Sequence, residues 1–549
     1  MKRVLDLKYR AIVFLLLLSS ACGVDKTTPI TISVTPNTAN SYVGEAVQFV
    51  ATVRNSTNTR VTWSLSGTGC NGTACGTISV SGLYTAPANV PNPAVVTIKA
   101  VSAADNTKSA SASITILDAV SNEWAWVSGS NIANQEGIYG TRGTASPENL
   151  PGARDNAISW VDHLGRLWLF GGGGHNDLWM YETTTHEWTW VSGSSALNQA
   201  GLYGTQGVPS PLNVPGARIA SVSWIDSSGD LWLFGGLGTD AYGNGGDLSD
   251  LWRYRPETNE WTWVSGNTGP YWSGFYGTKG IPDPSNKPGA RYKAVSWADS
   301  SGNLWLFGGQ GYDSAGQLGS LNDLWKYNIA ADEWVWVAGS DTRNQGGAYG
   351  IRGVSDTSNV PGARGYAVAW LDSQGKLWLF GGLGYDSTGW PGRLNDLWRF
   401  DPMSLEWTWI SGSNLAEQVG IYGIMGIADP LNVPGGRSEA ASWYDSDGRL
   451  WLFGGMGLDS LGLGDTSLND LWNFDQASLE WTWVSGNSSG NQWGVYGTRG
   501  IAGSSNVPGA RTGAVSWADS LGRLWMFGGN GFDSTGWPGP LNDLWKYFK

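Results

Sequence analysis

The sequence predicts an all-β protein in which a small β-sandwich is followed by a six-bladed β-propeller. Three observations predict this arrangement. Between residues 30 and 118, short runs alternate apolar and polar residues between turn signals, as in the strands of a sandwich. From residue 122 to residue 549 the chain consists of repeats. Each complete repeat holds four strand-like runs, which is the strand content of one antiparallel propeller blade.

Composition and charge agree with a folded protein of more than one domain. A chain of 549 residues is too long for one hydrophobic core. It contains 35 tryptophans and 80 glycines, and only 14% of its residues are charged, which is the opposite of a disordered composition. The net charge of -13 predicts an acidic surface, which phosphate backbones and anionic membrane surfaces repel. We therefore expect no nucleic-acid partner.

The first element, residues 1–21, has the pattern of an export signal. Basic residues precede the apolar run AIVFLLLL at 11–18, which is too short to span a bilayer. The following SSAC resembles a bacterial lipoprotein box, which implies that Cys22 is lipidated and becomes the first residue of the mature chain. Ser19 departs from the commonest form of that box, and an ordinary secretion cut after Ala21 is the alternative. We expect an exported protein, either held in the cell envelope by a lipid or secreted.

A short linker, residues 22–29, leads to the predicted sandwich at residues 30–118. The runs VTWSLSG, GLYTAP and SASITI resemble those of bacterial immunoglobulin-like domains, which are mostly spacers. Cys70 and Cys75 lie close together in this segment and predict a disulfide in an oxidising compartment, which leaves Cys22 as the odd cysteine. Two cysteines without a nearby histidine make a poor zinc site.

The predicted propeller, residues 122–549, is marked once per unit by PGAR or PGGR. In the third unit the four strand-like runs are KAVSW, NLWLFGG, DLWKY and EWVWV. These runs are apolar on both sides, as expected for blades that neighbouring blades cover on both faces. The six markers begin at Pro151, Pro215, Pro288, Pro361, Pro434 and Pro508.

The runs also carry a family resemblance. The double glycine that ends the second run, the Trp and Tyr of the third and the Trp of the fourth resemble kelch repeats. The resemblance covers residues 122–549 and implies a kelch-type propeller similar to the central domain of galactose oxidase. The later units are about 73 residues long against roughly 50 for a typical kelch repeat, and the surplus lies in two loops per unit.

Closure of the ring is predicted from an incomplete repeat at each end. The sixth unit contains only three of the four runs, whereas EWAWV at 123–127 is a fourth run without the other three. An open ring would leave unpaired strand edges, which is a known hazard. We therefore expect EWAWV to form the outer strand of the last blade.

Long loops are expected on one face of the propeller. Strand direction alternates within a blade, so the loop between the second and third strands opens on the same face as the connection between blades. Both are long in most units, and long loops on a rigid scaffold are where binding usually resides. In the first unit, GGGGHNDLW replaces a loop that is nine or ten residues longer elsewhere, which predicts a notch in the rim.

Repeated charged residues on this face allow two interpretations. The arginines could form an anion-binding ring around the channel mouth. Alternatively, each arginine could pair with an aspartate or with loop carbonyls and hold the long loops in place. Because repetition within one chain points to structure, we favour the second interpretation, and we interpret the recurrent tyrosines as loop anchors too. The residues are Arg154, Arg218, Arg291, Arg364, Arg437 and Arg511; Asp177, Asp250, Asp323, Asp396, Asp470 and Asp543; and Tyr139, Tyr203, Tyr276, Tyr349, Tyr422 and Tyr496.

Function is better sought where the units differ. Four tryptophans fall in the long loops, outside the strand pattern, and an indole offers a rigid apolar face to a sugar ring or a partner protein. The alternative is packing against neighbouring prolines. These candidates are Trp272, Trp390, Trp493 and Trp537.

Acidic residues in the same loops offer the oxygen ligands that calcium takes. Their spacing matches no known calcium loop, so we favour solvated turns and expect no metal site. These residues are Asp240, Asp247, Asp313, Asp386, Asp459, Asp465 and Asp533.

Enzyme functions find less support. The resemblance to galactose oxidase would imply a copper held by two histidines and two tyrosines, one of them joined to a cysteine, but residues 122–549 contain no cysteine. The three histidines, His163, His175 and His186, all fall in the first unit, and strand counting places His175 on the opposite face from the other two. The sequence lacks the G-x-S-x-G, P-loop and H-E-x-x-H motifs. We therefore assign no catalytic residue and no cofactor.

We expect a monomeric binding or adhesion protein whose long-loop face takes a glycan or a protein ligand. The alternative is a carbohydrate-active or oxidative enzyme that uses acids on that face, and a third possibility is a purely architectural envelope component. Two or three non-repeated carboxylates at the channel mouth would favour an enzyme. Exposed tryptophans beside a shallow notch would favour binding.

Overall fold

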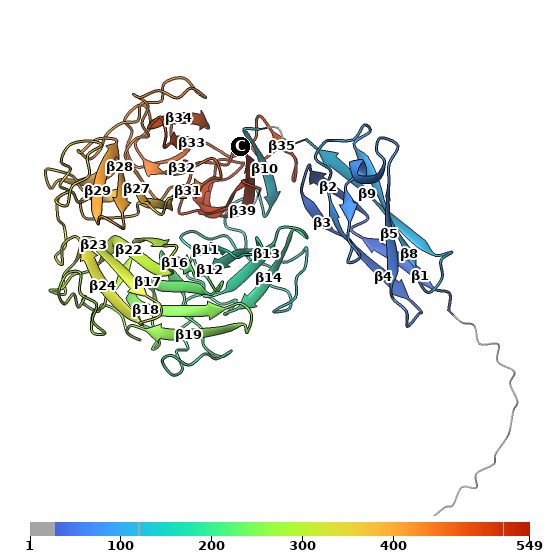
Figure 1. Ribbon diagram of the computed structural model, residues 1–549, viewed down its shortest axis with the longest axis horizontal. Helices are drawn as coiled ribbons and strands as arrows, with labels where there is room; N and C mark the ends of the chain where they lie inside the picture. The colour runs from blue at the N-terminus through green and yellow to red at the C-terminus, as the bar shows by residue number, and fades with distance from the viewer. Residues whose placement is uncertain (1–27, 119–120, 520) are drawn as a thin grey trace, which may run out of the picture. The chain divides into compact units, whose positions relative to one another are not determined.

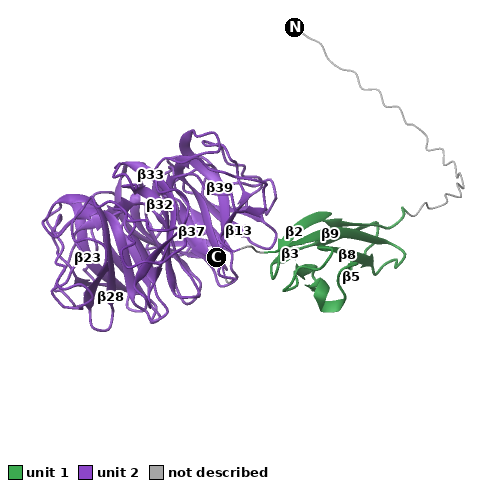
Figure 2. Ribbon diagram, turned by 90° about the horizontal axis from the view of Figure 1, so that it is seen from above, with its two compact units in different colours: residues 1–118 green, residues 119–549 purple. Residues whose placement is uncertain are grey.

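The computed structural model describes residues 28–118, 121–519 and 521–549. Its contacts divide the chain into two compact units, residues 1–118 and residues 119–549 (Figure 2). Among the described residues, no helix has the length and apolar character needed to cross a membrane. The predictions of a signal peptide at residues 1–21 and of a lipid on Cys22 lie outside the described residues.

The first unit consists of three small sheets around one core (Figure 1). In the longest strands apolar residues alternate with exposed ones, as predicted, because one face of each sheet packs on the core. A disulfide joins Cys70 and Cys75, as predicted, across a short helical turn, Gly72–Cys75. The strands are β1 (Thr31–Thr35), β2 (Thr38–Tyr42), β3 (Ala46–Gln48), β4 (Val50–Arg54), β5 (Val61–Ser66), β6 (Thr77–Ile78), β7 (Leu83–Thr85), β8 (Val95–Ser102) and β9 (Ser109–Leu117), in sheets β1-β4, β2-β9-β8-β5 and β3-β7-β6.

The second unit repeats one antiparallel sheet six times, and each sheet resembles a propeller blade (Figure 1). Sheet 1 has β11 (Ile158–Val161), β12 (Leu167–Phe170), β13 (Leu178–Glu182) and β14 (Glu187–Ser192). Sheet 2 has β15 (Arg218–Ile219), β16 (Val222–Ile225), β17 (Leu231–Thr239), β18 (Gly245–Arg255) and β19 (Glu260–Ser265). Sheet 3 has β20 (Arg291–Tyr292), β21 (Val295–Ala298), β22 (Asn303–Tyr312), β23 (Leu318–Asn328) and β24 (Glu333–Ala338).

Sheets 4 to 6 follow the same plan. Sheet 4 has β25 (Arg364–Gly365), β26 (Val368–Leu371), β27 (Leu377–Tyr385), β28 (Pro391–Asp401) and β29 (Glu406–Ser411). Sheet 5 has β30 (Arg437–Ser438), β31 (Ala441–Tyr444), β32 (Arg449–Gly457), β33 (Thr466–Asp475) and β34 (Glu480–Ser485). Sheet 6 has β36 (Arg511–Thr512), β37 (Val515–Ala518), β38 (Leu524–Phe532), β39 (Pro538–Phe548), β10 (Glu123–Ser128) and β35 (Ala502–Gly503).

The apolar strands are buried on both faces because consecutive sheets stack on each other. In sheet 3, Leu304 to Gly309 of β22 are all buried. The ring of Trp305 lies 5.8 Å from that of Phe400 in sheet 4. Such contacts between aromatic rings recur from sheet to sheet and account for the regular spacing of tryptophan in the sequence.

β10 pairs with β39 although more than 400 residues separate them. The register places Trp126 opposite Trp545. Trp124 is 1% exposed, and its ring lies 5.0 Å from that of Tyr547. The predicted neighbourhood of the EWAWV run is therefore present in the structure.

The innermost strands contact one another in the order β11, β16, β21, β26, β31, β37, and β37 also contacts β11. The double glycines permit this close approach. Gly235 and Gly236 have φ angles of 61° and 101°, and a Cβ on Gly235 would lie 2.7 Å from the carbonyl oxygen of Arg291 in the next sheet. The same contact recurs up to Gly528, where the carbonyl belongs to Arg154 of sheet 1.

Candidate functional site

The repeated arginines and aspartates lie paired and buried beneath the long loops. Both Nη atoms of Arg291 donate to the carboxylate of Asp323, at 2.7 and 2.8 Å. Its remaining donors bond the carbonyls of Gly289 and Gly308. The six pairs are Arg154–Asp177, Arg218–Asp250, Arg291–Asp323, Arg364–Asp396, Arg437–Asp470 and Arg511–Asp543. Since each guanidinium is neutralised and out of contact with solvent, these arginines do not form an anion-binding ring.

Each of these aspartates also accepts bonds from the connection between sheets. Tyr276 donates its hydroxyl to Asp323 at 2.6 Å, and the indole N–H of Trp325 donates to the same oxygen at 2.7 Å. Burial raises the pKa of Asp250, but the charge of Arg218 and the hydrogen bonds from Arg218, Tyr203 and Trp252 together outweigh burial and hold that pKa below its ordinary value. In every unit, one arginine, one aspartate, one tyrosine and one tryptophan thus hold the connection against the sheet. The backbone beneath the long loops is therefore fixed by buried hydrogen bonds.

The acidic loop residues are mostly turn-forming acceptors. The carboxylate of Asp386 accepts bonds from the backbone N–H groups of Thr388, Trp390 and Ala416. Equivalent bonds occur at Asp240, Asp313, Asp459 and Asp533. The expectation of solvated turns is wrong for these five, which are at most 3% exposed, because their carboxylates replace water with N–H donors.

The other two acidic residues behave differently. Asp465 forms an ion pair with Arg393. Asp247 is 4% exposed, and burial raises the pKa of its carboxyl to about 6. Within the described residues, no three histidine, cysteine or carboxylate side chains are grouped so that they could hold a metal ion.

The three histidines do not converge. His175 lies between β12 and β13, whereas His163 and His186 lie in the hairpins at the other end of sheet 1. His186 Nδ1 is 3.0 Å from the hydroxyl of Tyr181. Burial, together with the charge of Arg154, lowers the pKa of His175 to about 4, so it is neutral at ordinary pH.

The four candidate tryptophans are exposed, and one of them, Trp493, packs against the loop that carries another, Trp537. Trp272 is 52% exposed, Trp493 is 59% exposed, and Trp390 and Trp537 are each 68% exposed. Trp493 lies against Gly536, where an added Cβ would be 2.1 Å from its ring, and Gly536 directly precedes Trp537. Trp390 and Trp272 belong to other sheets. Trp272 and Trp493 also line grooves of about 310 and 410 Å³ between adjacent sheets.

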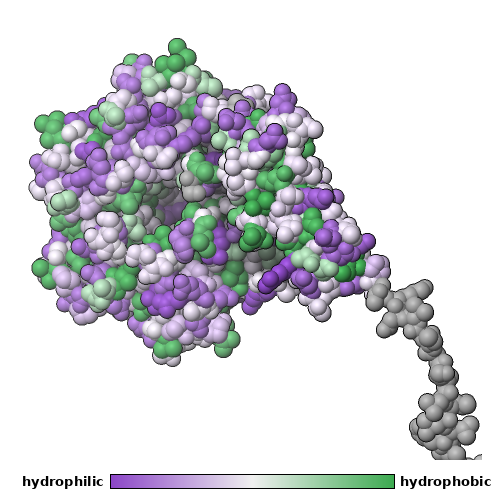
Figure 3. Space-filling model, turned by 45° about the vertical axis from the view of Figure 1, so that its right-hand side comes forward, coloured by the Kyte–Doolittle hydropathy of each residue, from purple (hydrophilic) through white to green (hydrophobic). Residues whose placement is uncertain are grey.

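Sheet 1 has the shorter loop that its sequence predicts. β12 and β13 have four and five residues, against nine and eleven in β17 and β18, because the first unit lacks the extension of the second and third strands. The space-filling view of the second unit shows a hollow at its centre, surrounded by interspersed hydrophobic and hydrophilic surface (Figure 3).

A pocket of about 140 Å³, which the sequence did not predict, is lined by residues that directly precede the innermost strands of all six sheets. Six of its lining residues lie two positions after the repeated arginines: Asn156, Ala220, Lys293, Tyr366, Glu439 and Gly513. All six have positive φ angles, between 55° and 63°. Each donates its backbone N–H to the carbonyl of its counterpart in the preceding sheet, and Asn156 donates to Gly513, so the bonds form a cycle.

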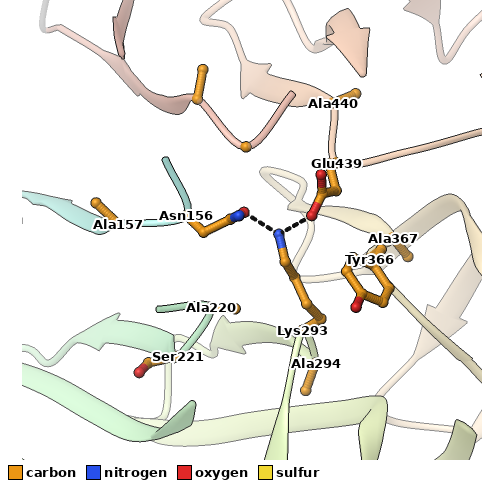
Figure 4. Close-up of a pocket in the computed structure, with 12 residues that line it drawn as sticks. Asn156, Ala157, Ala220, Ser221, Lys293, Ala294, Tyr366, Ala367, Glu439 and Ala440 are labelled. Atoms are coloured by element: carbon orange, nitrogen blue, oxygen red, sulfur yellow. Dashed lines mark hydrogen bonds and ion pairs between the residues drawn. The ribbon is translucent and has the colours of Figure 1, made fainter. Parts of the chain in front are cut away.

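The side chains of this axial pocket carry charge (Figure 4). Lys293 extends across it, forms an ion pair with Glu439 at 2.6 Å and donates a hydrogen bond to Asn156. Its ammonium lies 5.1 Å from the ring centre of Tyr366. Burial raises the pKa of the adjacent Asp155 even though Lys293 opposes the shift. The signal in the sequence was a fixed position after each arginine at which six different residues occur.

No family model matches the sequence. Among solved structures, that of YjhT matches with 14% identity and a TM-score of 0.43, over 72% of this chain and 95% of that chain. A fungal alcohol oxidase of the AA5 family, in complex with copper, matches with 13% identity and a TM-score of 0.39, over 74% of this chain and 76% of that chain. Similarity at this level assigns neither an activity nor a cofactor to the present chain.

Proposed function

We propose that the second unit is a closed six-bladed propeller of the kelch type, that β10 is the strand that closes it, and that the first unit is an immunoglobulin-like spacer. The pairing of β10 with β39 supports the closure. The cycle of six backbone hydrogen bonds around the axial pocket supports it independently, because a cycle needs neighbours on both sides of every sheet.

We propose further that the long-loop face binds a glycan, with the exposed indoles as its contact surfaces. The observation that carries this proposal is the exposure of Trp390 and Trp537, each 68%, on loops whose backbones are fixed by buried aspartates. A ligand that covers an exposed indole removes apolar surface from water, which is favourable. A sugar ring presents a flat array of C–H groups of about the size of an indole, and both partners are rigid before binding, which limits the entropy lost.

We propose that the protein is a monomer that is exported and held by a lipid at Cys22, and that the first unit follows the anchor along the chain. Growth with labelled palmitate tests the anchor. The full chain is expected to incorporate label and the Cys22→Ala variant to incorporate none. Label in the variant, or none in either chain, would exclude lipidation at this residue.

A glycan array tests the binding face. We expect residues 23–549 to bind at least one glycan, and the Trp390→Ala and Trp537→Ala variants to bind it more weakly. Met403→Ala is a matched control, since Met403 is 92% exposed in the β28–β29 hairpin on the opposite face, and it should bind as the wild type does. If the wild type binds only proteins, or if the tryptophan variants match the control, the glycan proposal is wrong.

The axial pocket favours a second candidate function, acid–base catalysis on a small molecule. Asp155 and Glu439 are non-repeated carboxylates, and Lys293 contacts both Glu439 and Asn156 in the pocket. A positioned acid and base beside a cavity are the components of proton-transfer catalysis. If this candidate holds, NMR of a panel of mono- and disaccharides will show conversion by the wild type and none by Glu439→Gln or Lys293→Met. Absence of conversion by the wild type would exclude it for that panel.

A further inference from the structure

The heptapeptide Asp-Ser-Thr-Gly-Trp-Pro-Gly occurs twice, at 386–392 and at 533–539, and we call these segments the twin loops. They connect β27 to β28 and β38 to β39, and thus belong to sheets 4 and 6. Sheets 2, 3 and 5 carry other residues in the corresponding loops, and sheet 1 has a shorter loop. Two of the six sheets therefore carry an identical seven-residue loop, and sheet 5 lies between them.

The twin loops have the same geometry. The carboxylate of Asp386 accepts bonds from the N–H groups of Thr388 at 2.8 Å and Trp390 at 3.0 Å. The carboxylate of Asp533 accepts bonds from Thr535 and Trp537 at the same two distances. The glycines before the tryptophans have φ angles of 79° and 80°. The two indoles are consequently presented alike, and both are 68% exposed.

The indole is not needed to form the turn. At its position sheets 2, 3 and 5 have Asn244, Gln317 and Leu463, and in each the aspartate at the start of the loop donates its backbone N–H to the carbonyl of that residue, as it does in the twin loops. The turn therefore tolerates amide, aliphatic and aromatic side chains. Formation of the turn therefore does not require tryptophan at this position. Two copies of an exposed tryptophan indicate that the indole surface contacts a ligand.

The second twin loop is completed by the start of the second unit. In sheet 4, Asp386 also accepts a bond from the N–H of Ala416, and Ser387 donates to the carbonyl of Asn414, both in the connection that follows sheet 4. In sheet 6 the same two bonds come from Ala133 and Asn131, just after β10. The strand that pairs with β39 thus also brings the segment that supports Trp537.

The twin loops differ in the residues that pack against them. Trp493 lies against Gly536 of the second loop, whereas the corresponding residue beside Gly389 of the first loop is Gly346. The second loop therefore has a further indole, that of Trp493, packed against it, and the first loop has Gly346 in its place. Because the two loops offer the same exposed side chain, a ligand that binds both in the same way must carry the same chemical unit at two places along its length.

Building on the proposed glycan-binding function, we propose that the twin loops are two subsites of the same kind for one neutral polysaccharide of repeating hexose units, with the stronger subsite at Trp537, where Trp493 packs against the loop. The chain's net charge of -13 disfavours acidic polysaccharides. Engagement of the second subsite by a chain already held at the first is intramolecular, so a polymer long enough to span both gains about 10²- to 10⁴-fold in affinity over a short fragment, provided the geometry allows both contacts.

The test compares long and short chains of the same sugar. Laminarin, dextran and galactomannan are titrated into residues 23–549, each beside its own di- to hexasaccharide. For at least one sugar we expect the polysaccharide to bind about 100-fold or more tighter than its fragments. The Trp390→Ala and Trp537→Ala variants should each bind polymer with nearly the affinity of the fragment. A polymer offers many overlapping positions to a single site, which raises its apparent affinity. The single variants, each with one remaining subsite, measure that increase.

Further variants separate the alternatives. Trp493→Gly gives the second loop a glycine neighbour like Gly346 beside the first loop. This variant should bind fragments more weakly and still prefer the polymer. Met403→Ala should change neither affinity. Equal binding of fragment and polymer by the wild type, or a polymer preference that survives both single variants, overturns the twin-site proposal and leaves glycan binding intact. Binding of none of the three polysaccharides or their fragments overturns the twin-site proposal, and an empty glycan array then refutes the proposed function as well.

Discussion

A disulfide between β10 and β39 tests directly whether the two ends of the second unit are held together. Ala125 and Lys546 are partners in the register of the two strands. Antiparallel partners have Cα atoms about 4.5 to 5.5 Å apart, which is within the range of a disulfide. The chain-entropy relation gives about 6 kcal/mol for a closed loop of roughly 420 residues, and strain in the native state will reduce this figure. We expect the oxidised Ala125→Cys/Lys546→Cys variant to be at least ~2 kcal/mol more stable than its reduced form.

The assay is urea unfolding of the oxidised and reduced protein, followed by tryptophan fluorescence, with mass spectrometry to count thiols. The matched control is Lys326→Cys/Val335→Cys, the corresponding cross-strand pair in sheet 3. Its loop of roughly nine residues predicts only about 2.6 kcal/mol. If the cysteines at 125 and 546 do not pair under mild oxidation, or if pairing leaves the urea midpoint unchanged, β10 does not close the ring.

Three further predictions concern buried groups. Arg291→Met leaves the carboxylate of Asp323 buried without its cation, so unfolding in urea should show a loss of about 3–5 kcal/mol, whereas Arg60→Met in the first unit should show almost none. Since the folded pKa of Asp247 is raised to about 6 from 3.8, its contribution to stability is complete below pH 3.8 and is lost as pH rises through 6. Asp247→Asn should therefore be more stable than wild type above pH 6, with the difference vanishing near pH 4, and a pH-independent difference would contradict the assignment. Cys70→Ser should lower the unfolding free energy of the first unit by about 2 kcal/mol and leave the transition of the second unit in place, which calorimetry resolves.

The strands could be predicted from sequence because one physical constraint repeats along the chain. Stacked sheets require apolar residues on both faces, so tryptophans recur at fixed positions, and close approach of backbones requires Gly235 and its counterparts. The incomplete unit at each end likewise indicated where β10 pairs. Such features depend on local sequence and on one rule of assembly.

The sequence predicted that the repeated arginines pair with aspartates, as the structure shows, but the geometry of each pair could not be predicted in the same way. Arg291 and Asp323 are 32 residues apart, and only the register of the strands reveals that they meet as a bidentate pair. Likewise, Asp386 is a conspicuous acid in a loop, but its role follows from N–H groups that the fold supplies. A sequence shows which groups are charged, whereas the fold decides which of them are neutralised.

The candidate sites could be predicted from the sequence to different degrees. Exposed tryptophans stood out because they broke the repeat. The contact of Trp493 with Gly536 could not be predicted, because it forms only when the loop that carries Trp493 reaches the hairpin of the following sheet. The axial pocket was hidden for the opposite reason: its residues share a position and no chemistry, so nothing marks them until the six sheets are arranged around one axis.

The central proposal is that exposed indoles of the long-loop face bind a glycan. The most direct measurement is a glycan-array comparison of residues 23–549 with the Trp390→Ala/Trp537→Ala double variant and the Met403→Ala control. The account predicts that the wild type and the control bind the same glycan, and that the double variant, still folded by circular dichroism, loses that binding at least tenfold. A folded double variant that binds as strongly as the wild type would contradict the account.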